Sequence, residues 1–219
     1  MQCLFDTQFD YVISLGENCG GAMHLSYNGL RKEPFPLDWI KGPSFEERVE
    51  LILNHFSGFL EIENLKPAPM YETSAKHAGV IDTNTGFIFL HDFASDASLR
   101  DFSEIKNKYN QRITKLYEKV EKTPSVLFIW FGKESNEPNE VLTKGREKLS
   151  MFFHKEIYIL AFQNNKDIET PYCEQISPFL IRYSFDFKDD PNSEDAWMGD
   201  PQLFRSILSK VVLKNEYDI

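Results

Sequence analysis

The stretch that decides the fold is Tyr11-Val12-Ile13-Ser14-Leu15-Gly16-Glu17-Asn18-Cys19, followed by two glycines at 20 and 21. Residues 11–15 form a short apolar run rich in β-forming residues, and the run stops at Gly16. The apolar residues between 22 and 27 recur at helical spacing. We therefore predict a strand, a tight turn and a helix, with Cys19 at the start of the helix.

Outward from this stretch, predicted strands and helices alternate along the chain. Helices are predicted over residues 44–58, where Ser44 and Glu47 make a capping box, over 98–120, over 141–153, and after Asp200-Pro201. Strands are predicted over 125–131, 157–162 and 179–185. A hairpin is predicted over 80–90, with His91 where its second strand ends. This alternation favours one α/β domain over residues 1–219, layered, with a partly parallel central sheet flanked by helices.

Composition excludes several classes of protein. The chain has 219 residues, of which 42% are hydrophobic, and this is enough to bury a full core. Its net charge is −10 and it has no basic run, so we expect no nucleic-acid partner. No segment reaches the roughly 20 apolar residues that span a bilayer, and the start resembles no signal peptide. We expect a cytoplasmic protein without a membrane partner.

The three cysteines are far apart in the sequence. Cys3, Cys19 and Cys173 form no C-x-x-C motif, which predicts free thiols, no disulfide framework and no zinc site. The turn after Gly16 also lacks the glycine-rich fingerprints of nucleotide sites. We predict no metal and no cofactor.

Cys19 has the features of a nucleophile. A cysteine at a helix start lies near unpaired N–H groups and the positive end of the helix dipole, which lower a thiol pKa. Gly20 would leave space for a substrate, and backbone amides with the Asn18 side chain could hold an oxyanion. The alternative is that Cys19 is a small buried apolar residue and that the glycines only permit the turn.

A thiol nucleophile needs a base, and His91 is the best placed of the five histidines because a polar segment follows it. His24 is the rival, but a spacing of five residues turns it away from Cys19 on a helix. Asp92 or Asp38 could orient the imidazole of His91. Adjacent strand residues point to opposite faces, so Asp92 reaches His91 only where the strand has ended. Asp38 could instead anchor the turn before Trp39.

Four segments resemble a known family. They are Ile13 to Cys19, Pro36-Leu37-Asp38-Trp39, His91-Asp92-Phe93 and Trp197-Met198-Gly199-Asp200, and the resemblance runs from Phe9 to about Leu208. The family is the bacterial DUF1796 family, described as papain-like cysteine peptidases. The resemblance implies Cys19 as nucleophile and His91 as base, and it offers a papain-like α+β fold as the alternative. Papain-like enzymes have a glutamine shortly before the nucleophile, whereas none lies here between Gln8 and Cys19.

Two functions follow. The first is a cysteine-dependent hydrolase, peptidase-like or an acyltransferase, which acts on a peptide or acyl substrate through Cys19 and His91. The second is a non-catalytic carbohydrate- or protein-binding domain, or a transferase, that uses the crevice at the carboxyl ends of the strands. A hydrogen bond between Cys19 and His91 would distinguish the first from the second.

Overall fold

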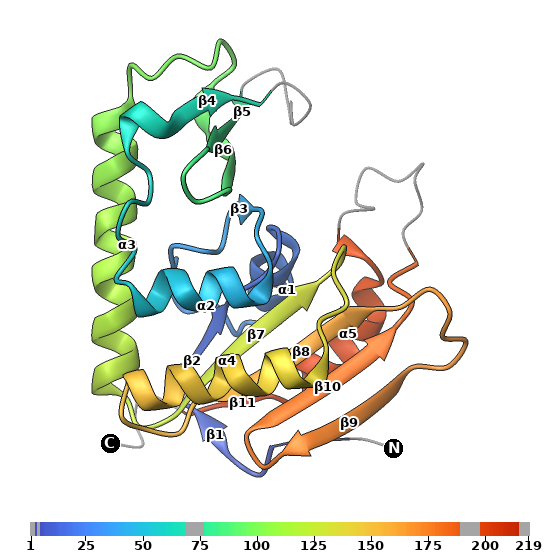
Figure 1. Ribbon diagram of the computed structural model, residues 1–219. Coiled ribbons are helices and arrows are strands. Elements are labelled where there is room, and N and C mark those ends of the chain that lie inside the picture. Colours follow the sequence, from blue (N-terminus) through green and yellow to red (C-terminus); the bar gives the residue numbers. More distant parts are fainter. Residues whose placement is uncertain (1–2, 4, 69–76, 189–197, 215–219) are drawn as a thin grey trace.

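The computed structural model describes residues 3, 5–68, 77–188 and 198–214, and its largest element is a five-stranded sheet (Figure 1). The strands, in their order across the sheet, are β2 (Tyr11–Ser14), β7 (Val126–Gly132), β8 (Tyr158–Asn164), β10 (Leu180–Phe185) and β9 (Tyr172–Ser177). The first four are parallel, and β9 pairs with β10 in the antiparallel direction. The predicted layered α/β fold with a partly parallel sheet is confirmed, and the papain-like α+β alternative is not what the chain adopts.

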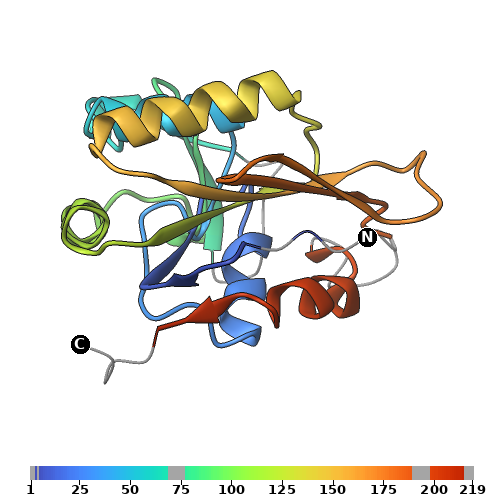
Figure 2. The same cartoon turned by 90° about the horizontal axis from the view of Figure 1, so that it is seen from below.

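Helices cover both faces of this sheet. Figure 2 shows α2 (Phe45–Leu53) and α4 (Asn139–Phe152) on one face, and α1 (Gly20–Tyr27) and α5 (Pro201–Leu208) on the other. The long α3 (Phe102–Lys122) lies beyond the β2 edge. Double coverage explains why every residue of β7 is buried, because a strand between two helical layers has no solvent-facing side.

A smaller antiparallel sheet lies above the carboxyl end of β2 (Figure 1). Its strands, in spatial order, are β3 (Ile40–Lys41), β6 (Ile88–Ala94), β5 (His77–Asp82) and β4 (Leu65–Pro67), with a short 3-10 helix, η1 (Ile62–Asn64), before β4. The predicted hairpin is the β5–β6 pair, and it is confirmed. A separate pair joins β1 (Gln8–Phe9) to β11 (Val212–Leu213) in parallel.

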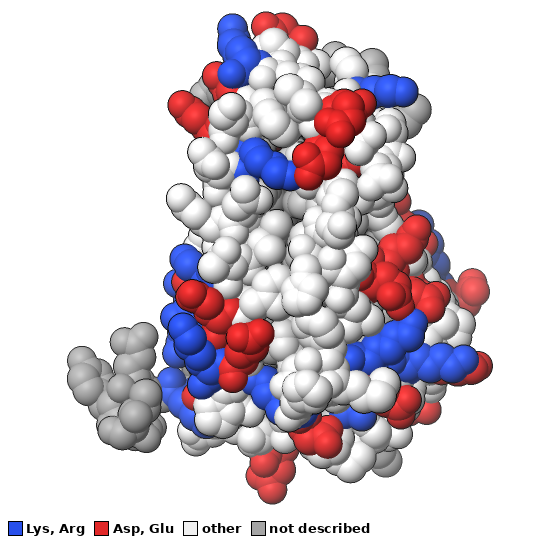
Figure 3. Space-filling model, turned by 60° about the vertical axis from the view of Figure 1, so that its left-hand side comes forward, with Lys and Arg blue, Asp and Glu red and all other residues white. Residues whose placement is uncertain are grey.

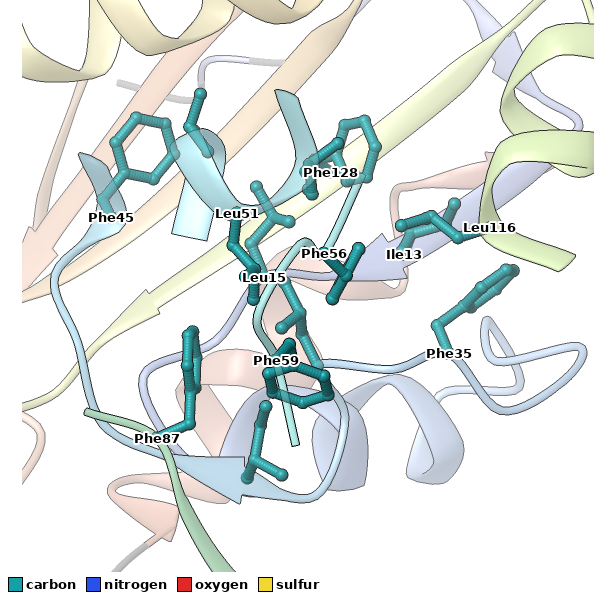
Figure 4. Packing of buried hydrophobic residues seen from close by; sticks show 14 of the residues in the cluster. Ile13, Leu15, Phe35, Phe45, Leu51, Phe56, Phe59, Phe87, Leu116 and Phe128 are labelled. Atoms are coloured by element: carbon teal, nitrogen blue, oxygen red, sulfur yellow. The ribbon is translucent and has the colours of Figure 1, made fainter. Parts of the chain in front are cut away.

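One apolar cluster joins the two sheets. Figure 4 shows side chains from β2 and β7 of the large sheet packed with side chains from α2, from α3 and from the segment before β6; among them are Ile13, Phe128, Leu51, Leu116 and Phe87. A second cluster lies on the opposite face of the large sheet, under α1 and α5. Because the first cluster contains side chains of both sheets, burial of this apolar surface fixes the small sheet over the end of β2.

The outer side of α3 is polar. The helix forms ion pairs from Lys115 to Glu33 at 2.9 Å and from Lys106 to Glu61 at 2.9 Å. Figure 3 shows acidic and basic side chains interspersed on the side of the molecule where α3 lies. Such exposed pairs are worth little individually, so the buried stripe of α3 holds it in place.

Several predicted helix ends need correction. The capping box of Ser44 and Glu47 is present, but α2 ends at Leu53 instead of continuing to residue 58. His55 and Phe56 both have φ of 57°, and this left-handed conformation ends the helix. The predicted cap at Asp200 is confirmed, since its carboxylate accepts from the N–H groups of Gln202 and Leu203.

Close packing of α4 on α2 depends on Gly145. A Cβ atom added there would collide with the ring of Phe45 and lie 3.3 Å from a methyl group of Val49. We predict that Gly145→Ala lowers the free energy of unfolding by roughly 1–3 kcal/mol, because the overlap outweighs the better helix propensity of alanine. Glu147→Ala, on the exposed side of α4, is the control. Urea unfolding measures both, and a stabilised Gly145→Ala would contradict this packing.

Candidate active site

The turn after β2 stays attached to β7. The N–H of Leu15 donates to the carbonyl of Ile129 at 2.8 Å, and the N–H of Glu17 donates to that of Phe131 at 3.3 Å. The side chain of Ser14 accepts from the N–H of Gly16 at 3.1 Å. The backbone before Cys19 therefore continues along the edge of the large sheet.

Cys19 occupies the N-cap position of α1, as predicted. Its carbonyl accepts from the N–H of Met23 at 3.0 Å, and its side chain is 9% exposed. Burial raises the pKa of the Cys19 thiol, while its own backbone N–H and the charges of Lys41 and Lys133 act in the opposite direction. The expectation that the helix start lowers this pKa is wrong, because desolvation of the thiolate outweighs the favourable charges.

The supporting residues Asn18 and Gly20 bind each other. The Oδ1 atom of Asn18 accepts from the N–H of Gly20 at 2.8 Å, which occupies an amide that was expected to stabilise an oxyanion. A Cβ atom at Gly20 would lie 2.6 Å from the ring of Phe131. On this side of Gly20 the space is filled by the protein, so the expectation that the glycine leaves room for a substrate is wrong there.

Glu17 connects the turn to the segment after β7. Its buried carboxylate accepts from the N–H of Glu134 at 2.7 Å and from that of Ser135 at 3.4 Å. The side chain of Glu134 in turn forms an ion pair with Lys41 at 2.6 Å. Through these contacts Glu17 holds the segment that carries Lys133 beside the Cys19 turn.

Arg48 is a second organising residue, and the sequence analysis missed it. Its fully buried guanidinium donates from Nη2 to the carbonyls of Glu17, Ile40 and Gly42, and from Nε to that of Pro43. Burial lowers its pKa to about 9, which still leaves it charged at neutral pH. Arg48 follows Phe45 by three residues and therefore lies on the apolar face of this capped helix. That position in the sequence was the signal that could have identified it.

His91 lies on the small sheet. It is exposed, its ring meets that of Trp39 edge-on at 6.2 Å between centroids, and the His77 ring lies 6.5 Å away. Partial burial lowers the pKa of His91, Asp92 opposes this, and His77 adds to it. The strand continues to Ala94, so the prediction that it ends at His91 is wrong.

A bulge accounts for the neighbours of His91. Ala78 of β5 pairs with Phe93 of β6, and Val80 of β5 pairs with Phe89 of β6. Two steps along β5 therefore correspond to four steps along β6. Regular alternation would place His91 on the same face as Phe89 and Phe93, but the extra residues break this alternation, so that both phenylalanines lie in the core while His91 is exposed. The pattern of hydrophobic residues in the sequence does not predict such a bulge.

The two candidate carboxylates have other partners. Asp92 accepts from the hydroxyl of Tyr109 at 2.8 Å and from Lys108, both on α3. Asp38 is buried and accepts from Arg31 at 2.8 Å and from the N–H of Phe35 at 2.9 Å. The bond to the backbone of Phe35 is what the alternative role predicts, in which Asp38 anchors the turn before Trp39. Burial raises the pKa of Asp38, and Arg31 opposes the change. Neither carboxylate is hydrogen-bonded to His91 in the described part of the chain.

Cys19 and His91 are not paired in this structure. Across the described residues, no hydrogen bond joins the Cys19 sulfur to the His91 ring. The cations that act on Cys19 are Lys41 and Lys133, whereas the groups that act on His91 are Asp92 and His77. The charges of Lys41 and Lys133 therefore act on the pKa of Cys19, whereas no hydrogen bond joins Cys19 to the predicted base in the described residues.

The described part of the chain has neither a cluster of metal-ligating side chains nor a membrane-spanning helix. In residues 3, 5–68, 77–188 and 198–214, no three His, Cys, Asp or Glu side chains come together as metal ligands. Within the same residues, no helix is both long and apolar enough to cross a bilayer. Trp197, part of one segment that carried the family resemblance, lies outside the described residues.

A family model described as "Putative papain-like cysteine peptidase (DUF1796)" matches residues 10–164. The chain belongs to the DUF1796 family. The match includes Cys19, Asp38, His91 and Asp92, but it is shorter than the resemblance from Phe9 to Leu208 that the sequence suggested. It ends before the segment from Met198 to α5.

One relative of this DUF1796 chain matches over nearly its whole length. The uncharacterized protein R408 of Acanthamoeba polyphaga mimivirus is 29% identical over 232 residues, covering 93% of this chain and 97% of its own. This relative is viral, whereas the sequence suggested a bacterial family. No solved structure matches the chain.

We predict that Arg48→Leu lowers the free energy of unfolding by roughly 2–4 kcal/mol, because it leaves buried carbonyl oxygens without donors. Arg100→Leu is the matched control: this arginine is 64% exposed and forms only long ion pairs, so its loss should change stability by less than about 0.5 kcal/mol. Chemical denaturation compares the two. Equal effects would contradict the organising role of Arg48.

His24 gives a prediction for pH. It is buried, its Nε2–H donates to the carbonyl of Met198 at 2.8 Å, and burial lowers its pKa below 6.5. Below pH 6.5 the unfolded chain therefore binds a proton that the folded chain does not, and stability falls as the pH falls. We expect His24→Gln, which has no such titration, to lose less stability between pH 7 and pH 5. Urea unfolding at each pH tests this, and parallel losses would contradict it.

Proposed function

We propose that this DUF1796 chain is a cysteine-dependent hydrolase or acyltransferase with Cys19 as the nucleophile. The observation that carries the proposal is the position of Cys19 at the first turn of α1, directly after a strand of the parallel sheet. The backbone N–H of Cys19 and the helix dipole at this position favour negative charge on sulfur. The family description, cysteine peptidase, agrees with this chemistry.

Two cations support the same assignment. Lys41 on β3 and Lys133 after β7 both favour the thiolate of Cys19. They would also favour the negative charge that develops on a carbonyl oxygen during attack by sulfur. Since Asn18 and Gly20 bind each other, we propose that these lysines, with the Nδ2 group of Asn18, supply the electrostatic support expected of an oxyanion site.

The proposed reaction has two stages. The thiol of Cys19 loses its proton to a base and attacks the substrate carbonyl, and the leaving group departs with a proton to give a thioester. Water or another acceptor then attacks the thioester and restores the thiol. We propose His91 as the base, because its lowered pKa leaves the ring neutral at pH 7 and able to accept a proton. Transfer would require a bridging water or a closer approach of the two side chains.

The second candidate is a non-catalytic binding domain for a protein or carbohydrate. It is favoured by the missing hydrogen bond between Cys19 and His91 and by the raised pKa of the thiol. The carboxyl ends of the parallel strands, where ligands bind in open α/β sheets, could hold a ligand without any covalent step.

Acylation by p-nitrophenyl acetate separates the two candidates. For the hydrolase we expect release of nitrophenolate and one acetyl group on the peptide that contains Cys19, with Cys3 and Cys173 as internal comparisons. Cys19→Ser should abolish this acylation, and His91→Ala should slow it by at least about 100-fold. His154→Asn is the control histidine variant, because asparagine tolerates the left-handed backbone at this position, φ 53°.

One result would contradict the hydrolase, and another would contradict only the role of His91. A Cys19 that stays unacetylated while the protein is folded would leave the binding domain as the better account. Acylation at the same rate in His91→Ala would remove His91 as the base but retain Cys19 as the nucleophile. Mass spectrometry of proteolytic peptides and absorbance of nitrophenolate give the two readouts.

A further inference from the structure

The other two cysteines meet in space although 170 residues separate them. The backbone N–H of Cys3 donates to the sulfur of Cys173 at 2.9 Å, and the two side chains share a hydrogen bond. Neither cysteine is part of a disulfide. The sequence showed no close pair, so this contact is a product of the fold.

Their surroundings hold the two sulfurs in place. Cys173 lies on the edge strand β9 opposite Tyr183 of β10. The hydroxyl of Tyr183 donates to the carbonyl of Cys3 at 2.7 Å, which fixes the backbone of Cys3 over the same strand pair. Cys3 is 9% exposed within the cluster under α5, whereas Cys173 is only half-buried. A reagent in solution therefore reaches Cys173 more easily than Cys3.

We propose that Cys3 and Cys173 form a redox modification site that a low-molecular-weight disulfide, such as oxidised glutathione, converts into an intramolecular disulfide. This inference does not depend on the role of Cys19. Within the described residues, no other contact joins two cysteines. The bridge would tie the segment before β1 to the edge of the large sheet.

The chemistry takes two exchange steps. The Cys173 thiolate attacks one sulfur of glutathione disulfide, whose S–S bond breaks to release one glutathione and leave a mixed disulfide on Cys173. The Cys3 sulfur then attacks the Cys173 sulfur, a Cys3–Cys173 bond forms, and the second glutathione leaves. The two protein thiols are oxidised by two electrons, glutathione disulfide is reduced, and their two protons go to the leaving thiolates. Burial is the main cause that raises the pKa of Cys3, and it still acts when Cys173 is a mixed disulfide, so the second step should be the slower one and should accelerate above pH 7.

The test treats the whole protein with oxidised glutathione at pH 8, blocks the remaining thiols with N-ethylmaleimide and maps peptides without reduction. We expect a linked Cys3–Cys173 peptide from monomeric protein, reversed by dithiothreitol. Cys19→Ser should give the same peptide, whereas Cys3→Ser should give only a glutathione adduct on Cys173. Closure of so long a loop should also raise the midpoint of thermal unfolding by about 10 °C in the wild type, but not in Cys173→Ser.

Other outcomes would overturn the proposal. Mixed disulfides on wild-type Cys173 with no linked peptide would mean that the two sulfurs do not reach each other. A linked peptide found only in covalent dimers would mean that Cys3 and Cys173 pair between molecules. Because Cys19→Ser retains both cysteines of the pair, a failed acylation test at Cys19 and a failed disulfide test remain separate results.

Discussion

The hydrogen bonds of the buried Arg48 guanidinium are the interaction on which the candidate site depends. They join the carbonyl of Glu17 in the turn before Cys19 to carbonyls of residues 40–43, so that α2, β3 and the end of β2 share one donor. Water cannot replace this donor in the interior, and each unpaired carbonyl would cost free energy. Glu17 extends the network through its carboxylate to the backbone of residues 134 and 135. Three segments that are distant in sequence, around residues 17, 40–48 and 134–135, thereby fix the backbone next to Cys19.

The packing around Cys19 also affects the ionisation of its thiol. The same packing that positions Cys19 also desolvates it, and desolvation acts against the thiolate more strongly than the helix start and two lysines act for it. The free protein therefore holds a protonated thiol. If Cys19 is the nucleophile, ionisation must accompany the arrival of a substrate or the approach of a base, because no hydrogen bond joins Cys19 to His91 in the described residues.

The family description and the fold address different questions. Cysteine peptidase describes a chemistry, whereas the chain folds as a parallel sheet with helices on both faces. A reaction of this kind recurs on unrelated folds, so the architecture neither requires nor excludes it. What bears on function here is local: a thiol at a helix start, two cations that favour its thiolate, and an exposed imidazole on the small sheet.

The sequence by itself determined the α/β class, the strand and helix around Cys19, the hairpin, and the caps at Ser44 and Asp200, because these features depend on the periodicity and chemistry of neighbouring residues. Only the tertiary structure decided the partners of side chains. Asp92 turns to Tyr109, Asp38 to Arg31, Cys3 to Cys173, and Arg48 to four carbonyls. The sequence separation of these partners runs from five residues, between Arg48 and Pro43, to 170 residues, between Cys3 and Cys173. The tertiary structure also decided the sign of the pKa change at Cys19, because burial is a property of everything packed around a group and no local pattern records it.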